Sequence, residues 1–484
     1  MGEIKRLLAV DLGAESGRTV LGKLDGERLD VEEIRRFPNT PVEVAGTLYW
    51  DLPQLYADML DGVRAAGPVD SMGVDTWGVD FGLLDRAGHL LGNPVHYRDR
   101  RTEGMLEAAL RRVGREEIYE RTGIQFIPIN TLYQLMALVT SKDPQLGAAD
   151  RLLTMPALLG FWLTGAQADE FTDATTTQCY DPRAGGWAVG MLDKLGIPTR
   201  IFGAVVEPGT VLGAPRAELG LAASLVIAPG THDTASAVAA VPFESNQHAA
   251  YISSGTWSLV GVEVGQPLIN SEALEANLTN EGGVGGTFRL LKNVMGLWLL
   301  QECRRGWAAG GTDMSYDSLL RLAEAAPRFA AVIDPDDERL LRPGDMPARM
   351  VELAAQSGQQ LRPEPGVIAR CIFESLALKY RRTIEQLERV SGIQIRTVHV
   401  VGGGSSNRLL CQMTADACGR TVVAGPAEAT AIGNILVQAI ALGLVSSLEQ
   451  ARELIRRSVA LETYEPRSTH EWEVVGQMAQ RSWA

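Results

Sequence analysis

Apolar segments of strand length alternate with amphipathic segments of helix length along most of the chain. Leu7 to Val10 and Arg18 to Leu24 flank the turn DLGAESG, so the pattern predicts two strands joined by a tight loop. Residues 249–263 repeat this layout: an apolar run, a turn of small residues and a second apolar run. The alternation is typical of an α/β protein, and the similar units suggest an internal duplication with one such turn in each half.

The C-terminal part of the sequence carries a long helix and a strand–turn–helix unit. Residues 366–390 place apolar side chains at steps of four and precede Gly392, which predicts an amphipathic helix closed by a glycine. A strand is expected at 397–401, followed by the turn GGGSSN at 402–407 and a further helix.

Length and composition indicate a globular protein of two or three domains. The chain has 484 residues, of which 45% are hydrophobic and 21% charged. No low-complexity linker marks a boundary, so we place it near residue 240, just before the second of the two similar units. The expected domains are 1–240 and 241–450, with a helical segment at 451–484.

The net charge of −14 argues against a general nucleic-acid or anionic-membrane surface. No apolar stretch approaches the 18 residues that a membrane span needs, and the first apolar run is too short for a signal-peptide core. The five cysteines are scattered and form no C-x-x-C pair, which is typical of buried thiols in a reducing compartment. We therefore expect a cytoplasmic protein without nucleic-acid or membrane partners.

The turn at residues 11–18 is a candidate phosphate cradle. Its small residues offer backbone N–H groups, Asp11 is a candidate for holding Mg²⁺ through water, and Arg18 is a countercharge. An ordinary hairpin with an Asp in its turn remains the alternative. A P-loop is excluded because Leu24 stands where Ser or Thr binds Mg²⁺.

The turn SSGTWS at 253–258 is the second candidate cradle. Gly255 allows close backbone approach and Thr256 supplies a hydroxyl. Either turn alone is weak support for a phosphate site. A pair of them, one in each half, favours a nucleotide held by both halves.

Asp233 lies where a Pro-Gly turn enters a helix, in LVIAPGTHDTASAV. It is either a helix-capping residue or a general base that accepts the proton of a substrate hydroxyl. In the second case we expect the helix dipole to hold the carboxylate ionised. The neighbouring His232 is a candidate hydrogen-bond partner of the substrate or an ordinary packing residue.

The glycine-rich turn at 402–407 does not fit a dinucleotide-binding site, because Asn407 replaces the last glycine and residues 421–424 are neutral. Such a turn can instead lie against an adenine or ribose ring, or simply begin a helix.

Three further residues are candidates for ligand contacts. A helix is expected to begin near Asn293, and Gln301, eight residues on, would lie roughly 80° from it around that helix. Asn293 and Gln301 can contact the same ligand only if one of them lies at the end of the helix. Trp77, in DTWGVD, is a candidate for stacking on a sugar ring, with a core position as the alternative.

Eight sequence blocks, in order, together resemble the FGGY family of carbohydrate kinases over nearly the whole chain: DLGAESGR, GVDTWGVDFGLLD, YRDRRT, GTHDTASAV, YISSGTWSL, NEGGVGGTFRLLKNVMGLWLLQ, VVGGGSSNRLLCQMTADACG and AGPAEATAIGNILVQA. The resemblance implies a duplicated, ribonuclease-H-like (actin-like) fold of two α/β domains. The first domain would carry the catalytic Asp, the second would bind the nucleotide, and the active site would lie in the cleft between them.

The resemblance also implies roles for individual residues. Asp233 is similar to the base that deprotonates the sugar hydroxyl, and Asp11 to the acidic residue near Mg²⁺. The implied sugar contacts, to which Trp77 is added from its own chemistry, are Gly78, His232, Asp233, Thr234 and Asn293. The implied nucleotide contacts are Ala14, Glu15, Ser16, Gly17, Arg18, Thr256, Gln301, Gly402 and Gly403.

Glu15 departs from the family pattern, since many relatives carry Ser or Thr there. A carboxylate beside a triphosphate would repel it unless Mg²⁺ or Arg18 intervenes, so we expect the Glu15 side chain to point away.

The reaction implied is ATP- and Mg²⁺-dependent phosphorylation of O1 of a 6-deoxyketose. GTHDTASAV and LKNVMGLWLLQ point to the branch of the family that acts on L-rhamnulose. The alternatives are another ketose, such as L-fuculose, L-ribulose or xylulose, and, from a different class, an actin-like ATPase that responds to peptide instead of sugar. We expect a monomer or a small homo-oligomer.

Overall fold

The computed structural model describes residues 4–244 and 248–483. Its residue contacts define two compact units that are interleaved along the chain. Unit 1 draws on Met1–Ser245, Glu263–Leu290 and Ala429–Val459, and unit 2 on Asn246–Val262, Leu291–Glu428 and Ala460–Ala484. The contiguous domains 1–240, 241–450 and 451–484 stay a prediction. The two units are each assembled from several separate segments, so their bounds do not test boundaries drawn along the chain.

Unit 1 contains a six-stranded mixed sheet with the strand order β13-β14-β6-β1-β2-β3. Those strands are β1 (Lys5–Leu12), β2 (Ser16–Leu24), β3 (Leu29–Pro38), β6 (Val69–Thr76), β13 (Val211–Gly213) and β14 (Ala223–Ile227). Its short pairs are built from β4 (Val42–Val44), β5 (Thr47–Tyr49), β7 (Phe81–Leu84), β8 (Arg151–Thr154), β9 (Asp169–Glu170), β10 (Tyr180–Asp181), β11 (Gly186–Trp187) and β12 (Val205–Val206). The strand β17 (Thr279–Gly282) also lies in unit 1.

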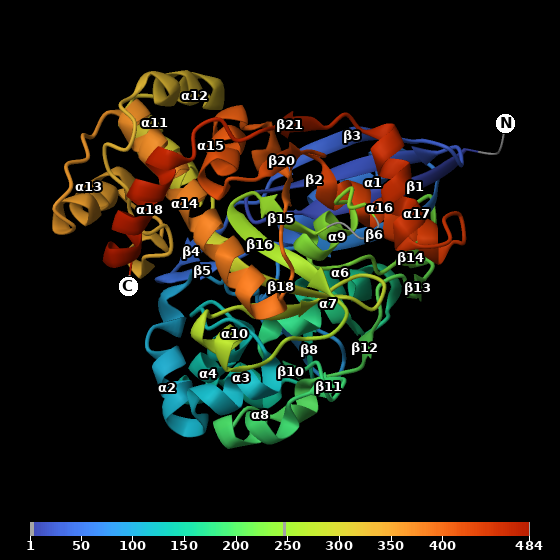
Figure 1. Ribbon diagram of the computed structural model, residues 1–484. Helices are drawn as coiled ribbons and strands as arrows, with labels where there is room; N and C mark the ends of the chain where they lie inside the picture. The colour runs from blue at the N-terminus through green and yellow to red at the C-terminus, as the bar shows by residue number, and fades with distance from the viewer. Residues whose placement is uncertain (1–3, 245–247, 484) are drawn as a thin grey trace. The chain divides into compact units, whose positions relative to one another are not determined.

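Helices cover this sheet and build the rest of unit 1. They are α1 (Leu52–Ala66), α2 (Met105–Val113), α3 (Arg115–Thr122), α4 (Thr131–Ser141), α5 (Pro144–Ala148), α6 (Met155–Thr164), α7 (Phe171–Ala174), α8 (Val189–Leu195), α9 (Asp233–Ala239), α10 (Ser271–Glu275), α16 (Ala429–Ala441) and α17 (Leu448–Ser458). Short 3₁₀ helices are η1 (Arg100–Thr102), η2 (Thr175–Thr177), η3 (Thr199–Ile201) and η4 (Ala217–Leu219). Although α16 comes late in the sequence, it packs against β1, β6 and α9. In Figure 1 its red ribbon lies near the blue strand β6 and the green helix α9.

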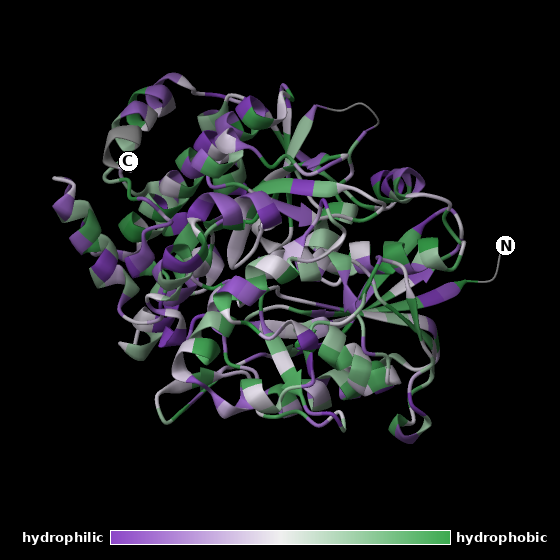
Figure 2. Cartoon of the chain, turned by 90° about the horizontal axis from the view of Figure 1, so that it is seen from below, coloured by the Kyte–Doolittle hydropathy of each residue, from purple (hydrophilic) through white to green (hydrophobic). Residues whose placement is uncertain are grey.

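Unit 2 is built on a sheet in which β18, β16, β15, β19, β20 and β21 are successive neighbours. Its strands are β15 (Ala249–Ser254), β16 (Trp257–Val264), β18 (Phe288–Met295), β19 (Thr397–Val401), β20 (Thr421–Ala424) and β21 (Glu462–Tyr464). The last two residues of β16 and the first three of β18, Arg289 among them, belong to unit 1. Its helices are α11 (Trp298–Ala309), α12 (Tyr316–Ala325), α13 (Met346–Gln356), α14 (Pro365–Ser391), α15 (Arg408–Cys418) and α18 (His470–Ser482), with η5 (Glu338–Leu340) and η6 (Gly403–Ser406). Figure 2 shows hydrophilic and hydrophobic residues mixed along many of the helices, the pattern expected of helices that pack through one face.

The two sheets share one connection pattern, which confirms the predicted duplication. In unit 1, β1 pairs antiparallel with β2 and parallel with β6. In unit 2, β15 pairs antiparallel with β16 and parallel with β19. The expected α/β fold of two units is therefore confirmed. The long helix is confirmed as well, since α14 ends at Gly392, whose φ is 72°.

One predicted boundary is wrong. The helix expected to begin near Asn293 begins at Trp298, and Asn293 lies on β18. The chain needs Gly296 between strand and helix, because a Cβ there would lie 2.6 Å from Ser258 Oγ and 2.7 Å from the carbonyl carbon of Trp257. Asn293 and Gln301 therefore stand on different elements, and the angle calculated for one shared helix does not apply.

Candidate functional site

In unit 1, the predicted phosphate turn is the tight connection between β1 and β2. Asp11 faces Arg18 across the hairpin, and Arg18 donates from Nε to Asp11 Oδ2 at 2.8 Å. Asn39 holds the turn from outside: its N–H donates to the Glu15 carbonyl at 2.9 Å and its side-chain amide to the Gly13 carbonyl at 2.9 Å. The turn is thus fixed by the protein itself before any ligand binds.

Gly17 is required by packing at the foot of this turn. A Cβ at residue 17 would lie 2.3 Å from the Phe37 ring and 2.7 Å from Leu12. The other turn residues, Ala14, Glu15 and Ser16, are half-buried. Their contacts with phosphate, and the direction of the Glu15 side chain, stay predictions.

The strand β6 brings two further predicted residues to the same edge of the sheet. Its end runs beside the end of β1, with Asp75 opposite Asp11. The N–H of Trp77 then donates to the Leu12 carbonyl at 3.3 Å, and Gly78 follows. A Cβ on Gly78 would lie 3.3 Å from the His232 ring. The DTWGVD loop and the start of α9 therefore adjoin.

Trp77 is a buried core residue, 5% exposed. Its ring centroid lies 4.0 Å from that of Trp50, and both indole N–H groups donate to Asp80 Oδ2, at 3.0 Å for Trp77 and 2.6 Å for Trp50. Burial raises the pKa of Asp80 to about 6, although the hydrogen bonds from the two indoles lower it in part. Of the two interpretations of Trp77, its burial favours the core position; stacking on a sugar stays a prediction.

Val79, next to Gly78, has an unusual backbone conformation. Its φ is 70°, a region that β-branched residues rarely adopt. The conformation is held by side chains, since Thr131 Oγ1 and Gln134 Nε2 donate to the Val79 carbonyl at 2.6 and 3.2 Å. Strain of this kind concentrates at ligand-binding loops, so the loop after β6 is a candidate ligand contact beyond Gly78 alone.

Asp233 is the first residue of α9, with His232 as its N-cap. The N–H of Thr234 donates to Asp233 Oδ1 at 2.5 Å, and the Thr234 hydroxyl donates to the same atom at 3.1 Å. His232 Nε2 lies 3.5 Å from Asp233 Oδ1, and about 30% of the Asp233 side chain is exposed. The structure therefore brings Asp233, His232 and Thr234 together with Gly78 in unit 1.

The surroundings of Asp233 act on its pKa in both directions, and its expected ionisation stays a prediction. Burial and the negative charge of Asp11 raise the pKa of Asp233, and His232 and the Thr234 donors lower it only in part. The helix α9 has only seven residues, and the carboxylate shares its surroundings with Asp11. A raised pKa makes Asp233 a better proton acceptor when it is ionised.

Asp75, which sequence reasoning missed, extends this acidic edge. Burial and the neighbouring Asp11 raise the pKa of Asp75 well above its ordinary value. Asn434 of α16 donates to Asp75 Oδ2 and to the Gly73 carbonyl. The only signal in the sequence was its place in the block GVDTWGVD, from which only Trp77 and Gly78 were singled out.

The acidic edge fits an outer-sphere magnesium site. Asp11 is partly committed to Arg18, while Asp75 Oδ1 is buried and accepts no hydrogen bond. Within residues 4–244 and 248–483, no cluster of three or more His, Cys, Asp or Glu forms a complete metal cage. Carboxylates that bind Mg²⁺ through water molecules match this arrangement, since Mg²⁺ usually keeps several of its waters.

In unit 2, the second predicted cradle is the turn between β15 and β16. The chain just before α11 and the start of that helix close over it: Leu297 N–H donates to the Gly255 carbonyl and Trp298 N–H to the Thr256 carbonyl, both at 3.0 Å. Gln301 lies in the first turn of α11, and its side-chain oxygen is buried without a hydrogen-bond partner. An unsatisfied buried acceptor is costly, which favours a ligand donor at this place.

Gly402 and Gly403 follow β19 and differ in their surroundings. Gly402 has a φ of 80°, and a Cβ there would lie 2.9 Å from the Ser254 carbonyl oxygen. A Cβ on Gly403 would meet no atom within 4 Å. The chain therefore needs glycine at 402 for its own fold, whereas Gly403 presents a bare backbone that a flat ring can approach.

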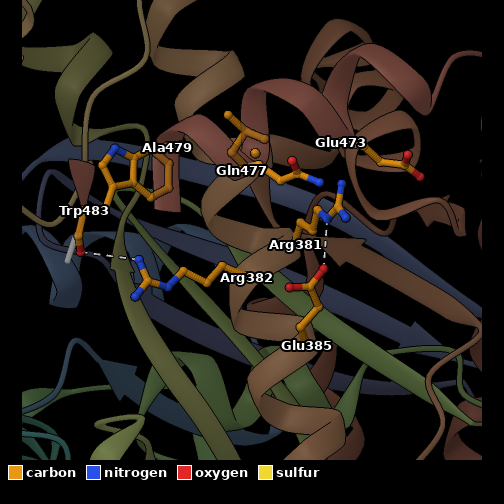
Figure 3. Close-up of a pocket in the computed structure, with 9 residues that line it drawn as sticks. Arg381, Arg382, Glu385, Glu473, Gln477, Ala479 and Trp483 are labelled. Atoms are coloured by element: carbon orange, nitrogen blue, oxygen red, sulfur yellow. Dashed lines mark hydrogen bonds and ion pairs between the residues drawn. The ribbon is translucent and has the colours of Figure 1, made fainter. Parts of the chain in front are cut away.

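Figure 3 shows a different pocket in unit 2, between α14 and α18. Arg382 points to the carbonyl of Trp483, at 3.4 Å, and Arg381 Nε donates to Glu385 at 2.9 Å. Leu378, Gly476 and Ala479 complete much of its wall. None of the predicted site residues lines it, and its arginines are engaged within the protein, so it is a seam of helix packing.

No helix in the part of the chain described here combines the length and the apolar character that a bilayer span requires.

Comparisons with known structures place this architecture among two-domain sugar kinases. A gluconate kinase from Lactobacillus acidophilus superposes with a TM-score of 0.80 at 16% identity, covering 99% of this chain and 97% of that one. A glycerol kinase from Plasmodium falciparum, solved with ADP, gives 0.74 at 15% identity, with coverage of 100% and 97%. At these identities the likeness shows the fold alone.

Sequence comparison establishes the family. The N-terminal domain of the FGGY family of carbohydrate kinases matches residues 6–240, and the C-terminal domain of that family matches residues 250–442. The chain belongs to the FGGY family of carbohydrate kinases.

Its curated relatives include three rhamnulokinases of nearly equal length. The protein from Bacteroides thetaiotaomicron is 45% identical and covers 97% of both chains. That from Pectobacterium carotovorum is 44% identical, covering 96% of this chain and 94% of the relative. That from Oceanobacillus iheyensis is 40% identical, covering 94% and 97%.

Proposed function

We propose that this protein transfers the γ-phosphoryl group of ATP to O1 of L-rhamnulose. The observation that carries the proposal is the 40–45% identity to proteins named rhamnulokinase over almost the entire chain. The geometry of unit 1 supports it, because Asp233 stands at a helix start beside His232, Thr234 and Gly78 with its carboxylate partly exposed.

In the proposed reaction, Asp233 accepts the proton of the O1 hydroxyl while that oxygen attacks the γ-phosphorus. The new P–O bond forms as the bond to the β-phosphate oxygen breaks, ADP leaves, and Asp233 releases its proton to solvent. Such transfers depend mainly on positioning and on neutralising phosphate charge. Mg²⁺ bound near Asp11 through water would supply part of that neutralisation.

The remaining residues are proposed to bind substrate and nucleotide. Gly78, His232, Thr234 and Asn293 are assigned to the sugar. In unit 1, Ala14 to Arg18 are assigned to the phosphates. In unit 2, Thr256, Gln301, Gly402 and Gly403 are assigned to the nucleotide, supported by the unsatisfied Gln301 oxygen and the open face of Gly403.

The test is the release of ADP by the purified protein with ATP, Mg²⁺ and a panel of ketoses: L-rhamnulose, L-fuculose, L-ribulose and D-xylulose. We expect kcat/KM to be at least about tenfold higher for L-rhamnulose, because a site that hydrogen-bonds each hydroxyl rejects the wrong orientation strongly. A higher kcat/KM for another ketose would reassign the substrate. Absence of sugar-dependent ADP release with every ketose would refute a kinase acting on these sugars.

A further inference from the structure

A buried ion pair lies behind His232, on the side of the ring away from Asp233. Glu281, on β17, and Arg289, on β18, face one another with Arg289 NH2 3.2 Å from Glu281 Oε2. The Arg289 side chain is fully buried and that of Glu281 is 4% exposed. Arg289 is fixed further by donating from Nε to the Gly282 carbonyl at 2.8 Å. A pair so deeply buried is expensive to maintain, which calls for a role other than stability.

Both members of this pair contact the inner nitrogen of the His232 ring. His232 Nδ1 lies 3.2 Å from Arg289 NH2 and 3.5 Å from Glu281 Oε2. The outer nitrogen, Nε2, lies 3.5 Å from Asp233 Oδ1, and the same ring edge adjoins Gly78. The ring therefore spans from the buried ion pair to the residues proposed to bind the ketose.

The contacts of the ring allow two arrangements of its protons. When Arg289 donates to Nδ1, that atom is an acceptor and the proton of a neutral ring sits on Nε2. When Glu281 instead accepts a proton from Nδ1, the Asp233 carboxylate beside Nε2 favours a second proton there. Both arrangements leave an N–H on the outer edge of the ring.

We propose that Glu281 and Arg289 are positioning residues that hold His232 with a proton on Nε2, so that it donates a hydrogen bond to an oxygen of the ketose. This inference rests on the proposed sugar kinase activity and adds two residues to it. Glu281 and Arg289 act through His232 and do not touch the substrate. Their action resembles that of the outer partners which fix a histidine ring in metal sites.

The backbone around His232 supports a fixed ring. Glu170 Oε2 accepts from the N–H and the hydroxyl of Thr231, at 2.8 and 2.7 Å, and the N–H of His232 donates to Thr172 Oγ1 at 3.2 Å. With its backbone anchored on one side and its Nδ1 on the other, the ring has little freedom to rotate. A substitution in the ion pair therefore alters the protonation of Nε2 and leaves the backbone of the loop in place.

The first test is kinetic and uses Glu281→Gln, which removes the charge but keeps the shape. We expect the KM for L-rhamnulose to rise about tenfold, the loss of one charge-assisted contact, with kcat within about threefold and the KM for ATP unchanged. In a His232→Ala background the same change should add less than about twofold, because its effect passes through the ring. An undiminished effect in that background would overturn the proposal.

The matched control is Glu374→Gln in unit 2. Glu374 is also buried and paired with an arginine, with Arg370 Nε 2.7 Å from its carboxylate. The Glu374→Gln variant should have a lower thermal midpoint and an unchanged KM for the ketose. An equal rise of that KM in the control would show that Glu281→Gln acts through stability alone, which would contradict the proposal.

A second measurement needs no substitution in the ion pair. In protein labelled with ¹⁵N-histidine, the His232 signals, assigned by their absence in His232→Ala, should show a protonated Nε2 at pH 7. An unprotonated Nε2 would overturn the inference. Because this measurement uses no sugar, it remains decisive even if the wild-type protein phosphorylates none of the ketoses, an outcome that refutes only the proposed function.

Discussion

The two central hairpins share their strand pairing but differ in charge at matching positions. Near the end of β1, Asp11 stands opposite Asp75 on the parallel strand. Near the end of β15, Ser253 stands opposite Val401. One topology thus carries carboxylates in unit 1 and neutral groups in unit 2. The difference agrees with the proposed roles, in which Asp233 of unit 1 accepts the proton and backbone and hydroxyl groups of unit 2 join the phosphate turn of unit 1 in binding the nucleotide.

The largest expected effect comes from removing the proton acceptor of unit 1. Asp233→Asn should lower kcat by about 10² to 10⁴, the usual contribution of a general base, and leave sugar binding within a few-fold. Steady-state kinetics and calorimetric titration with L-rhamnulose measure the two quantities. Near-normal turnover in a folded variant would remove Asp233 from the mechanism.

The next largest effect is expected from blocking the exposed backbone of unit 2 at Gly403. Gly403→Ala places a methyl group where the protein has no atom within 4 Å, so the thermal midpoint should not change. The KM for ATP should rise about tenfold if the nucleotide lies against this backbone. Its matched control is Gly402→Ala, which is strained by a φ of 80° and should lower the midpoint itself. Unchanged ATP kinetics in Gly403→Ala would argue against nucleotide contact here.

A smaller effect is expected in the pH dependence of kcat/KM, which reports on the Asp233 carboxylate of unit 1. Because the pKa of Asp233 is raised above 3.8, the acidic limb of kcat/KM should lie above that pH. Activity requires the ionised carboxylate, so it is retained above the raised pKa and lost as the pH falls through it. A profile that remains flat down to pH 4, in protein that stays folded, would show that this carboxylate does not limit the reaction.

The smallest effect concerns the strained loop of unit 1. Val79→Gly relieves a φ of 70° and should leave the free energy of unfolding within about 1 kcal/mol of the wild type, while the KM for the ketose rises a few-fold. Val44→Gly, in the exposed strand β4, is the control and should destabilise the protein by about 1 kcal/mol without changing that KM. Chemical denaturation and steady-state kinetics give both values. An unaltered KM in Val79→Gly would separate the strain from ligand binding.

The elements predicted with most success were those whose signal is local. Strand-length apolar runs gave the hairpins, and the spacing of apolar residues before Gly392 gave α14. The helix start at Asp233 was also predicted, since the Pro-Gly turn ends the preceding strand. The start of α11 was not, because the run VMGLWLL carries no polar residue and has no period that separates strand from helix.

The parts that could not be predicted depend on contacts between distant segments. Asp75 joins Asp11 through the pairing of β6 with β1, and Glu281 contacts His232 although the two are far apart along the chain. The raised pKa of Asp233 follows from its burial and, to a smaller extent, from the charge of Asp11. Sequence reasoning considered only the local helix and could not include these contacts.

The most direct measurement of the central claim follows both products at once, with wild-type protein and Asp233→Asn side by side. With ATP, Mg²⁺ and L-rhamnulose, ³¹P NMR of the wild type should show one L-rhamnulose 1-phosphate formed for each ADP, and at most about 1% of that rate in the variant. ADP without a sugar phosphate, or equal sugar phosphate from both proteins, would contradict the account.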